Sequence, residues 1–244
     1  MQKWIKSKYD IGNPELISVI DDLPLWSAPF GLKLLETVQL RKNMKVLDIG
    51  SGNGFPVIEL SQRLGDSCNV FGIDPWKDAV DRSRHKIKLW DITNLEIIEG
   101  QAESLSFSDK YFDLIISNNG INNVEDDKLV MKEVGRVAKK GAQLIITVNL
   151  PDTMIEFYDI FKMILKDYNK GKEIEKLEKH IYAKRKPLDY TKDLIRTNGF
   201  IIKNVYEDIF YLRYCDGTTM LNHFSIKLAF LENWIGLLQT KIPN

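Results

Sequence analysis

An acid followed by three alternating glycines is the feature of this chain that most directly indicates chemistry. The segment Val46-Leu-Asp-Ile-Gly-Ser-Gly-Asn-Gly54 opens with a short apolar run, which is typical of a buried parallel strand. Its glycines allow a tight turn and a close approach of the backbone to a ligand. Pro56 suits the first turn of a following helix, because its missing N–H would have no partner there. The sequence therefore predicts a strand–loop–helix unit that binds a ligand.

Asp48 and Phe55 distinguish between two kinds of ligand. Gly50 and Gly52 fit the dinucleotide pattern G-x-G-x-x-G, but Phe55 stands where the third glycine belongs. The Asp48 carboxylate would repel a diphosphate and would suit a ligand that carries positive charge. The D-x-G-x-G-x-G pattern resembles motif I of the class I S-adenosylmethionine (SAM)-dependent methyltransferases, whose cofactor has a sulfonium and an amino group but no phosphate. Taken alone, the segment also allows a glycine-rich turn with a solvated acid. A dinucleotide oxidoreductase stays possible, but Asp48 and Phe55 argue against it.

A second apolar strand, Asn69-Val-Phe-Gly-Ile-Asp74, also ends in an acid. Asp74 lies 20 residues after Gly54, about where a second strand brings a carboxylate to ribose hydroxyls. The resemblance implies that role for Asp74 and places Pro75 and Trp76 beside the adenine. Ordinary packing is an equally good interpretation of Trp76.

Three later segments follow the order of the same family. Leu95–Phe107 resembles the third strand and the turn after it, with Gln101 where the family usually has Asp; an amide both donates and accepts hydrogen bonds. Tyr111–Asn118 resembles the fourth strand, and Glu133–Val148 resembles the helix, turn and fifth strand that come next. The resemblance covers about residues 44–150. It implies contacts with SAM at Trp26, Asp48, Gly50, Gly52, Asn53, Asp74, Pro75, Trp76, Gln101, Ala102, Glu103 and Asn118.

The overall composition excludes several classes of protein. The 244 residues suit either one large domain or a domain with insertions. The 34 Lys and Arg residues equal the 34 Asp and Glu residues in number, so neither nucleic acid nor an anionic membrane is expected as a partner. The basic residues of Lys77–Lys88 are interpreted as a solvated helix face. Two cysteines fit a reducing cytoplasm and argue against a disulfide framework or a structural zinc site, so no metal is expected. We find neither a secretory signal nor an apolar run of membrane-spanning length.

Four regions of the chain differ in their pattern of apolar and charged residues. Residues 1–43 look like a helical cap, 44–150 like a SAM-binding core, 151–190 like a charged helical lid, and 191–244 like the end of the core. Phe200–Tyr206 and Ile209–Tyr214 are predicted as strands six and seven, the seventh antiparallel, followed by a closing helix over Leu221–Leu238. The predicted fold class is α/β, a Rossmann-like sheet of seven mostly parallel strands with helices on both faces.

Methyl transfer from a sulfonium is an in-line displacement that needs alignment and exclusion of water more than a catalytic dyad. A general base is required only for a protonated acceptor. Asn122 and Asn123 stand where many similar small-molecule enzymes have a histidine pair, and their carboxamides could bind a polar acceptor or simply stabilise the loop. Tyr158 and His223 are the other catalytic candidates, although a lone histidine is more often structural.

The resemblance is greatest to the ubiquinone/menaquinone-biosynthesis group of methyltransferases. It implies transfer of a methyl group to a small-molecule acceptor, with S-adenosylhomocysteine as the second product. An RNA or protein methyltransferase would instead have an open, basic pocket mouth, and a non-catalytic SAM-binding module would bind SAM without turnover. Arsenite methylation is disfavoured by the lack of a cysteine cluster, and Ser117–Gly120 does not supply the D/N-P-P-Y/F motif of nitrogen-methylating enzymes. The sequence allows a homodimer and does not identify the acceptor.

Overall fold

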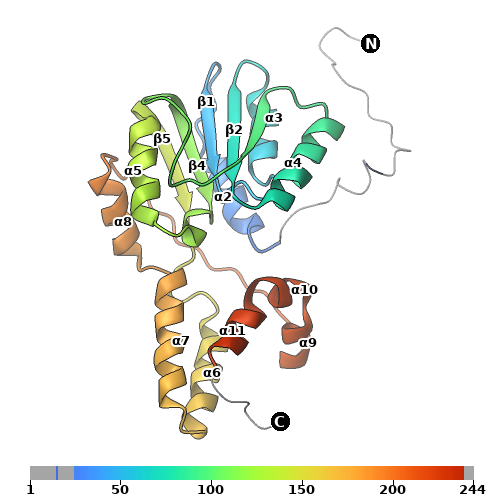
Figure 1. Cartoon of the computed structure of the whole chain (residues 1–244), viewed down its shortest axis with the longest axis vertical. Helices are drawn as coiled ribbons and strands as arrows, with labels where there is room; N and C mark the ends of the chain where they lie inside the picture. The colour runs from blue at the N-terminus through green and yellow to red at the C-terminus, as the bar shows by residue number, and fades with distance from the viewer. Residues whose placement is uncertain (1–14, 16–24, 239–244) are drawn as a thin grey trace. The chain divides into compact units, whose positions relative to one another are not determined.

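The computed structural model describes Glu15 and residues 25–238, and the chain divides into two compact units (Figure 1). The first unit runs to Val148 and resumes over Asp189–Ile202, and the second contains the other residues. Of the predicted N-terminal cap, residues 1–43, the segments 1–14 and 16–24 therefore lie outside the described residues. Each unit has hydrophobic clusters of its own, so each is described by itself.

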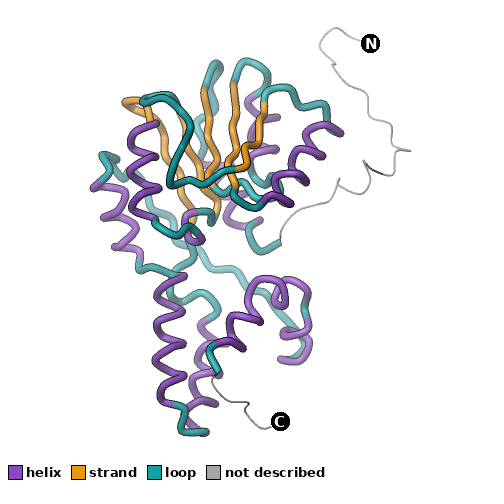
Figure 2. Tube along the Cα trace, in the orientation of Figure 1, coloured by secondary structure: helices purple, strands orange, loops and turns teal. Residues whose placement is uncertain are grey.

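A five-stranded parallel sheet forms the centre of the first unit, with the strand order β3-β2-β1-β4-β5 (Figure 2). The strands are β1 (Lys45–Ile49), β2 (Asn69–Asp74), β3 (Leu95–Glu99), β4 (Phe112–Asn118) and β5 (Ala138–Thr147). Strand β1 lies between β2 and β4, and Asp48 is in register with Gly72 on one side and Ile116 on the other. The direction of strand order reverses between β1 and β4, and open α/β sheets bind ligands beyond the carboxyl ends of the strands at such a point.

Helices cover both faces of this sheet, because alternate residues of the central strands point to opposite sides. Val46 packs on the face that is covered by α2 (Ala28–Thr37), α3 (Val57–Leu64) and α4 (Lys77–Leu89). Leu47 packs on the other face, under α5 (Asp127–Val137) and α8 (Leu188–Thr197). Both central strands are buried along almost their whole length, β1 at every residue after Lys45 and β4 at every residue except Asp113. The prediction of an α/β Rossmann-like fold is confirmed.

The second unit is helical. Its elements are α6 (Ile155–Asp167), α7 (Gly171–Lys184), α9 (Gly217–Asn222), α10 (Phe224–Ile226), the π-helical η2 (Lys227–Leu231) and α11 (Glu232–Gly236). Tyr158, Leu165, Leu177, Ile226 and Trp234 form its buried core. Helices α6 and α7 therefore share a core with the C-terminal helices, whereas the sequence predicts that residues 191–244 complete the sheet domain. In the part of the chain that the structure describes, every helix is too short or too polar to cross a membrane.

The predicted sixth and seventh strands are not confirmed. Residues 201–214 lie outside any helix or strand, and the side chains of Ile201 and Ile209 are 78% and 77% exposed. An alternating apolar pattern indicates a preference for extended backbone, but a strand also needs a hydrogen-bonded neighbour, which the pattern does not specify. The described structure thus has a sheet of five strands rather than seven.

Candidate functional site

The loop after β1 is held against the end of β2 by backbone hydrogen bonds. The N–H groups of Gly50 and Ser51 both donate to the carbonyl of Ile73, at 2.9 and 3.1 Å. The Gly52 N–H donates to Asp74 Oδ2 at 2.8 Å, and the Trp76 N–H donates to Oδ1 of the same carboxylate at 2.9 Å. Asp74 is therefore oriented before any ligand binds. Because each carboxylate oxygen can accept two hydrogen bonds, both oxygens keep capacity for ligand hydroxyls.

Asp48 is fully buried under the same loop. Neither of its carboxyl oxygens has a hydrogen-bond partner among the described residues. Burial, together with the nearby negative charge of Asp74, raises the pKa of the Asp48 carboxyl well above its ordinary value. A buried acid without a partner is costly, so a cationic ligand group that reached it would relieve that cost.

Two glycines bring the loops after β1 and β4 into direct backbone contact. A Cβ added to Gly50 would lie 2.6 Å from the Gly120 Cα, and one added to Gly120 would lie 2.2 Å from the Ile49 carbonyl oxygen. Ser117 completes the junction, since its hydroxyl donates to the Ile49 carbonyl and accepts from the Ile121 N–H. Only glycine fits at either position, and the two loops at the reversal of strand order are therefore positioned together.

The side chain of Asn118 links three elements of the first unit. Its Oδ1 accepts a hydrogen bond from the Thr147 hydroxyl in β5 at 2.8 Å, and its Nδ2 donates to the carbonyl of Ser27, just before α2, at 3.2 Å. Trp26, which precedes that serine, is half-buried. The Asn118 carboxamide is thus used for structure, and it brings the Trp26 segment to the carboxyl end of β4.

Asn122 and Asn123 lie in a short 3-10 helix, η1 (Ile121–Asn123), directly after that junction. The Asn123 Nδ2 donates to the Asn119 carbonyl at 3.2 Å, so this side chain stabilises the loop. The Asn122 Nδ2 is buried and has no hydrogen-bond partner among the described residues. Of the two predicted substrate contacts, Asn122 is therefore the one whose Nδ2 has no hydrogen-bond partner among the described residues.

The turn after β3 carries the predicted adenine contacts. Ala102 is buried, whereas Gln101 is exposed and available to a ligand. Glu103 Oε1 accepts the backbone N–H of Glu125 at 3.1 Å, so its carboxylate helps to hold the segment that leads into α5. At the end of β2, Pro75 and Trp76 are exposed, and the Trp76 side chain is 59% accessible. An open indole beside Asp74 offers a flat surface for a base.

Two residues that the sequence analysis did not single out hold the glycine loop from behind. Ser83 Oγ donates to the Gly52 carbonyl at 2.9 Å, and Lys86 Nζ donates to the Asn53 carbonyl at 2.7 Å. Both lie on the buried face of α4, and Lys86 is only 3% exposed. The interpretation of Lys77–Lys88 as a solvated face is therefore wrong for Lys86. Ser83 and Lys86 are spaced from the apolar residues Ala79 and Val80 so that all four lie on one face of the helix. This spacing is the sequence signal that indicates their burial.

The catalytic candidates Tyr158 and His223 belong to the second unit. Tyr158 is fully buried in the core, and its hydroxyl accepts hydrogen bonds from Arg185 Nη1 at 3.0 Å and Trp234 Nε1 at 3.1 Å. His223 Nδ1 lies 2.8 Å from Ser225 Oγ, and its ring meets the edge of Tyr214. The geometry gives Tyr158 a structural role in the core of that unit.

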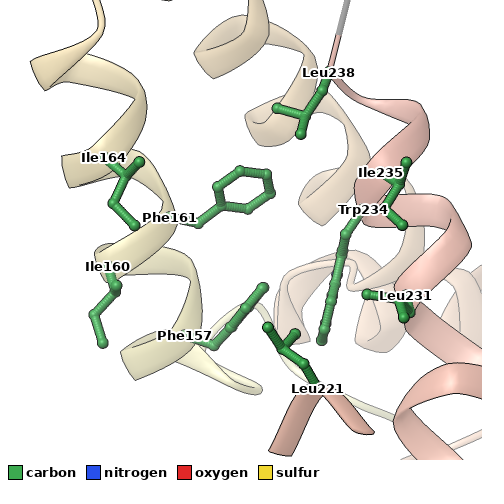
Figure 3. A pocket seen from close by; sticks show the side chains of 9 residues that line it. All are labelled: Phe157, Ile160, Phe161, Ile164, Leu221, Leu231, Trp234, Ile235 and Leu238. Atoms are coloured by element: carbon green, nitrogen blue, oxygen red, sulfur yellow. The ribbon is translucent and has the colours of Figure 1, made fainter. Parts of the chain in front are cut away.

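The second unit also contains an apolar pocket between α6 and α11 (Figure 3). Phe157, Phe161 and Trp234 face into it with aliphatic neighbours from both helices, and every described residue that lines it is apolar. None of the residues predicted to bind SAM contributes to this pocket. Among the described residues, no three His, Cys, Asp or Glu side chains gather as a metal site.

The glycine loop of the first unit suits a ligand with SAM's distribution of charge. The buried Asp48 oxygens match a cationic group, and Asp74 matches a pair of hydroxyls. The Asn53 N–H has no partner among the described residues and matches an acceptor such as a carboxylate. A Cβ added to Gly52 would meet no atom within 4 Å, so the space over the loop is open.

A sequence model of the family described as "Methyltransferase domain" matches residues 40–202. This chain belongs to that methyltransferase family. The match begins between α2 and β1 and ends after α8, and it includes all five strands and the glycine loop. It confirms the recognition of a class I SAM-dependent methyltransferase and of SAM as the cofactor.

Several curated relatives are named demethylmenaquinone methyltransferase. The one from Geobacillus sp. (strain WCH70) is 29% identical over 127 residues, which are 52% of this chain and 54% of that protein. The one from Anoxybacillus flavithermus is 28% identical over 175 residues, 68% of this chain and 74% of that protein. The chain thus spans about half to three quarters of the length of these relatives.

Solved structures agree on the fold. The YcgJ protein from Bacillus subtilis matches with a TM-score of 0.52 at 22% identity, covering 70% of this chain and 68% of its own. At this identity, the likeness concerns the fold and not the acceptor.

Proposed function

We propose that this methyltransferase transfers the methyl group of SAM to a small-molecule acceptor. The observation that carries the proposal is the fully buried Asp48, whose carboxyl oxygens have no partner among the described residues, beneath a glycine loop of the methyltransferase family. A small acceptor is supported by relatives named for demethylmenaquinone, although their identity to this chain is only 28–30%.

The proposed cofactor contacts follow the charges of the site. Asp48 faces the positively charged part of SAM, and Asp74 accepts from the two ribose hydroxyls. The remaining proposed contacts come from Trp26, Gly50, Gly52, Asn53, Pro75, Trp76, Gln101, Ala102, Glu103 and Asn118, and among them the Gln101 amide can hydrogen-bond the edge of the adenine.

The methyl group on the sulfonium is already activated, so the protein's task is to align the acceptor and to exclude water. Asn122 is the proposed acceptor contact, because its buried Nδ2 still has a hydrogen bond to give. Asn123 shapes the same loop. Residues 151–190 are proposed as the lid, since a long charged helical segment follows β5, whose carboxyl end lies on the cofactor side.

The proposal is tested by calorimetry with SAM, S-adenosylhomocysteine and NAD. Asp74→Ala removes the acceptor of the two proposed ribose hydrogen bonds, and with it the acceptor of the Gly52 and Trp76 N–H groups. It should weaken SAM binding by about 2–3 kcal/mol, which is roughly 30- to 150-fold. Asp78→Ala, on the exposed first turn of α4, is the matched control and should leave the affinity unchanged. Tighter binding of NAD than of either SAM or its product would contradict the proposal.

Turnover then separates the classes of acceptor. Methylation of quinol-type or other small molecules, with Asn122→Ala losing turnover while SAM affinity stays, supports the proposal. Methylation of RNA or of protein would point to the alternative acceptor class, and SAM binding without any turnover would point to a binding module.

A cytoplasmic location is proposed from the two cysteines, neither of which is in a disulfide.

A further inference from the structure

The two α4 side chains behind the glycine loop control the direction of its peptide groups. Ser83 binds the Gly52 carbonyl and Lys86 binds the Asn53 carbonyl, from positions three residues apart on one helix face. They are 0% and 3% exposed. A lysine is almost never buried unless its ammonium has strong partners, so a buried lysine on a backbone carbonyl is a specific arrangement.

Holding a carbonyl also fixes the N–H on the opposite side of the same planar peptide. Ser83 keeps the Gly52 carbonyl against α4, and the Asn53 N–H therefore points away from α4, where it has no partner among the described residues. Lys86 holds the next carbonyl in the same way. Gly52 and Gly54 have φ values of +51° and +106°, and glycine loops of this kind can rotate a peptide group at little cost.

We propose that Ser83 and Lys86 are positioning residues that hold the peptides of Gly52–Gly54 so that the Asn53 N–H is presented to the carboxylate of SAM. This inference rests on the proposed function. A carboxylate is the natural partner of a free N–H donor, and it is the anionic group of SAM. If α4 released the two carbonyls, a rotated Gly52–Asn53 peptide would present an oxygen to that carboxylate and repel it.

Adenosine separates positioning from general loop damage, because it shares the base and ribose of SAM but lacks the amino-acid part. We expect Ser83→Ala and Lys86→Met each to weaken the binding of SAM and S-adenosylhomocysteine by about tenfold or more. The affinity for adenosine should change by less than about threefold. Lys88→Met, on the exposed face of the same helix, is the matched control and should bind all three ligands like the wild type.

Calorimetry with the full chain, well below the melting temperature of each variant, is the measurement. Equal losses for adenosine and SAM would mean that the two residues only maintain the fold of the loop, and unchanged SAM affinity in both variants would also overturn the inference. If Lys86→Met does not fold, Ser83→Ala alone decides the question, since it removes a single hydroxyl. A wild-type protein that binds neither SAM nor its product contradicts the proposed function instead.

Discussion

At the scale of single residues, the buried Asp48 carboxyl opposes the folding of the free protein. Burial and the charge of Asp74 raise its pKa in the folded state, whereas in the unfolded chain the carboxyl titrates near its ordinary value of about 3.9. Above that pH the unfolded state releases the proton that the folded state retains. The free energy of unfolding therefore falls as the pH rises, until the folded carboxyl also ionises.

Asp48→Asn should remove this pH dependence. We expect the free variant to melt at a higher temperature than the wild type at pH 7, by several degrees, since about 1 kcal/mol corresponds to about 2–4 °C in a chain of this size. Near pH 4 the two proteins should melt within about 1–2 °C of each other. The same change should weaken SAM binding. Scanning calorimetry across pH 4–8 checks the first two results, and an Asn variant that is less stable at pH 7 would show that the carboxyl has a partner in solution.

Residue types alone indicate the acidic residues of the candidate site but not the side chains that hold the glycine loop in place. Asp48 and Asp74 could be predicted because each ends an apolar strand next to a glycine loop or its neighbour. Lys86 could not be distinguished from the solvated lysines of α4, because the choice between water and the Asn53 carbonyl depends on how that helix is rotated against the sheet. The sequence does not show that the Tyr158 hydroxyl, a catalytic candidate, is already bonded, because its partners Arg185 and Trp234 are 27 and 76 residues distant.

At the scale of elements, α5 fastens the long connection between β3 and β4. Glu133 receives both Nε and Nη2 of Arg136, at 2.8 and 2.7 Å, and also the N–H of Leu105. Arg136 in turn donates to the carbonyls of Leu105 and Phe107. The hydrogen bonds from Arg136 lower the pKa of Glu133, against a smaller opposing effect of burial. This network holds the connection against α5.

Glu133→Gln should destabilise the protein by about 1–2 kcal/mol at pH 7, a value reduced for the partial exposure of the pair. Because the folded pKa of Glu133 is lowered, its contribution is complete above the ordinary pKa of about 4.3 and is lost as the pH falls through the folded value. The difference between variant and wild type should therefore vanish in acid. Urea unfolding at pH 7 and pH 3 measures it, with Glu59→Gln, in an exposed pair with Arg63, as a control expected to change by less than about 0.5 kcal/mol. A constant difference at both pH values would contradict the assignment.

The five strands of the sheet could be predicted from the sequence because each is a short apolar run between turn signals. Residues 201–214 carry a similar apolar pattern, yet Ile209 and Tyr211 are 77% and 65% exposed and no strand forms there. What the pattern lacks is the identity of the neighbouring strand. The fold class followed from local signals, while the strand count depended on pairing between distant segments.

At the scale of the whole molecule, the chain leaves the sheet unit after Val148 and returns to it at Asp189. The second unit has its own buried core, in which the Tyr158 hydroxyl accepts from both Arg185 and Trp234. Because each unit has a buried core of its own, we expect the two units to open separately when one core is weakened.

Tyr158→Phe should weaken the second unit selectively. It leaves two buried donors without an acceptor, at a cost of about 1–3 kcal/mol. We expect faster amide hydrogen exchange in α6, α7 and α11, unchanged exchange in β1 and β4, and unchanged SAM affinity. Tyr182→Phe, at a 54% exposed position of α7, is the control. Equally faster exchange in both units would mean that they unfold as one, and a loss of SAM affinity would return Tyr158 to the site.

The contact between Gly50 and Gly120 bears on how enzymes of this shape could be redesigned. Because the backbones of the two loops touch, we expect that Ser117–Gly120 cannot be replaced by the corresponding segment of an unrelated enzyme without disturbing the cofactor loop. The next residues, from Ile121 to Asp126, end at the N-cap of α5, and Ile121 takes part in the Ser117 junction only through its backbone N–H. A chimera designed for a new acceptor should therefore exchange residues 121–126 and keep both glycines, so that acceptor specificity changes while the affinity for SAM does not.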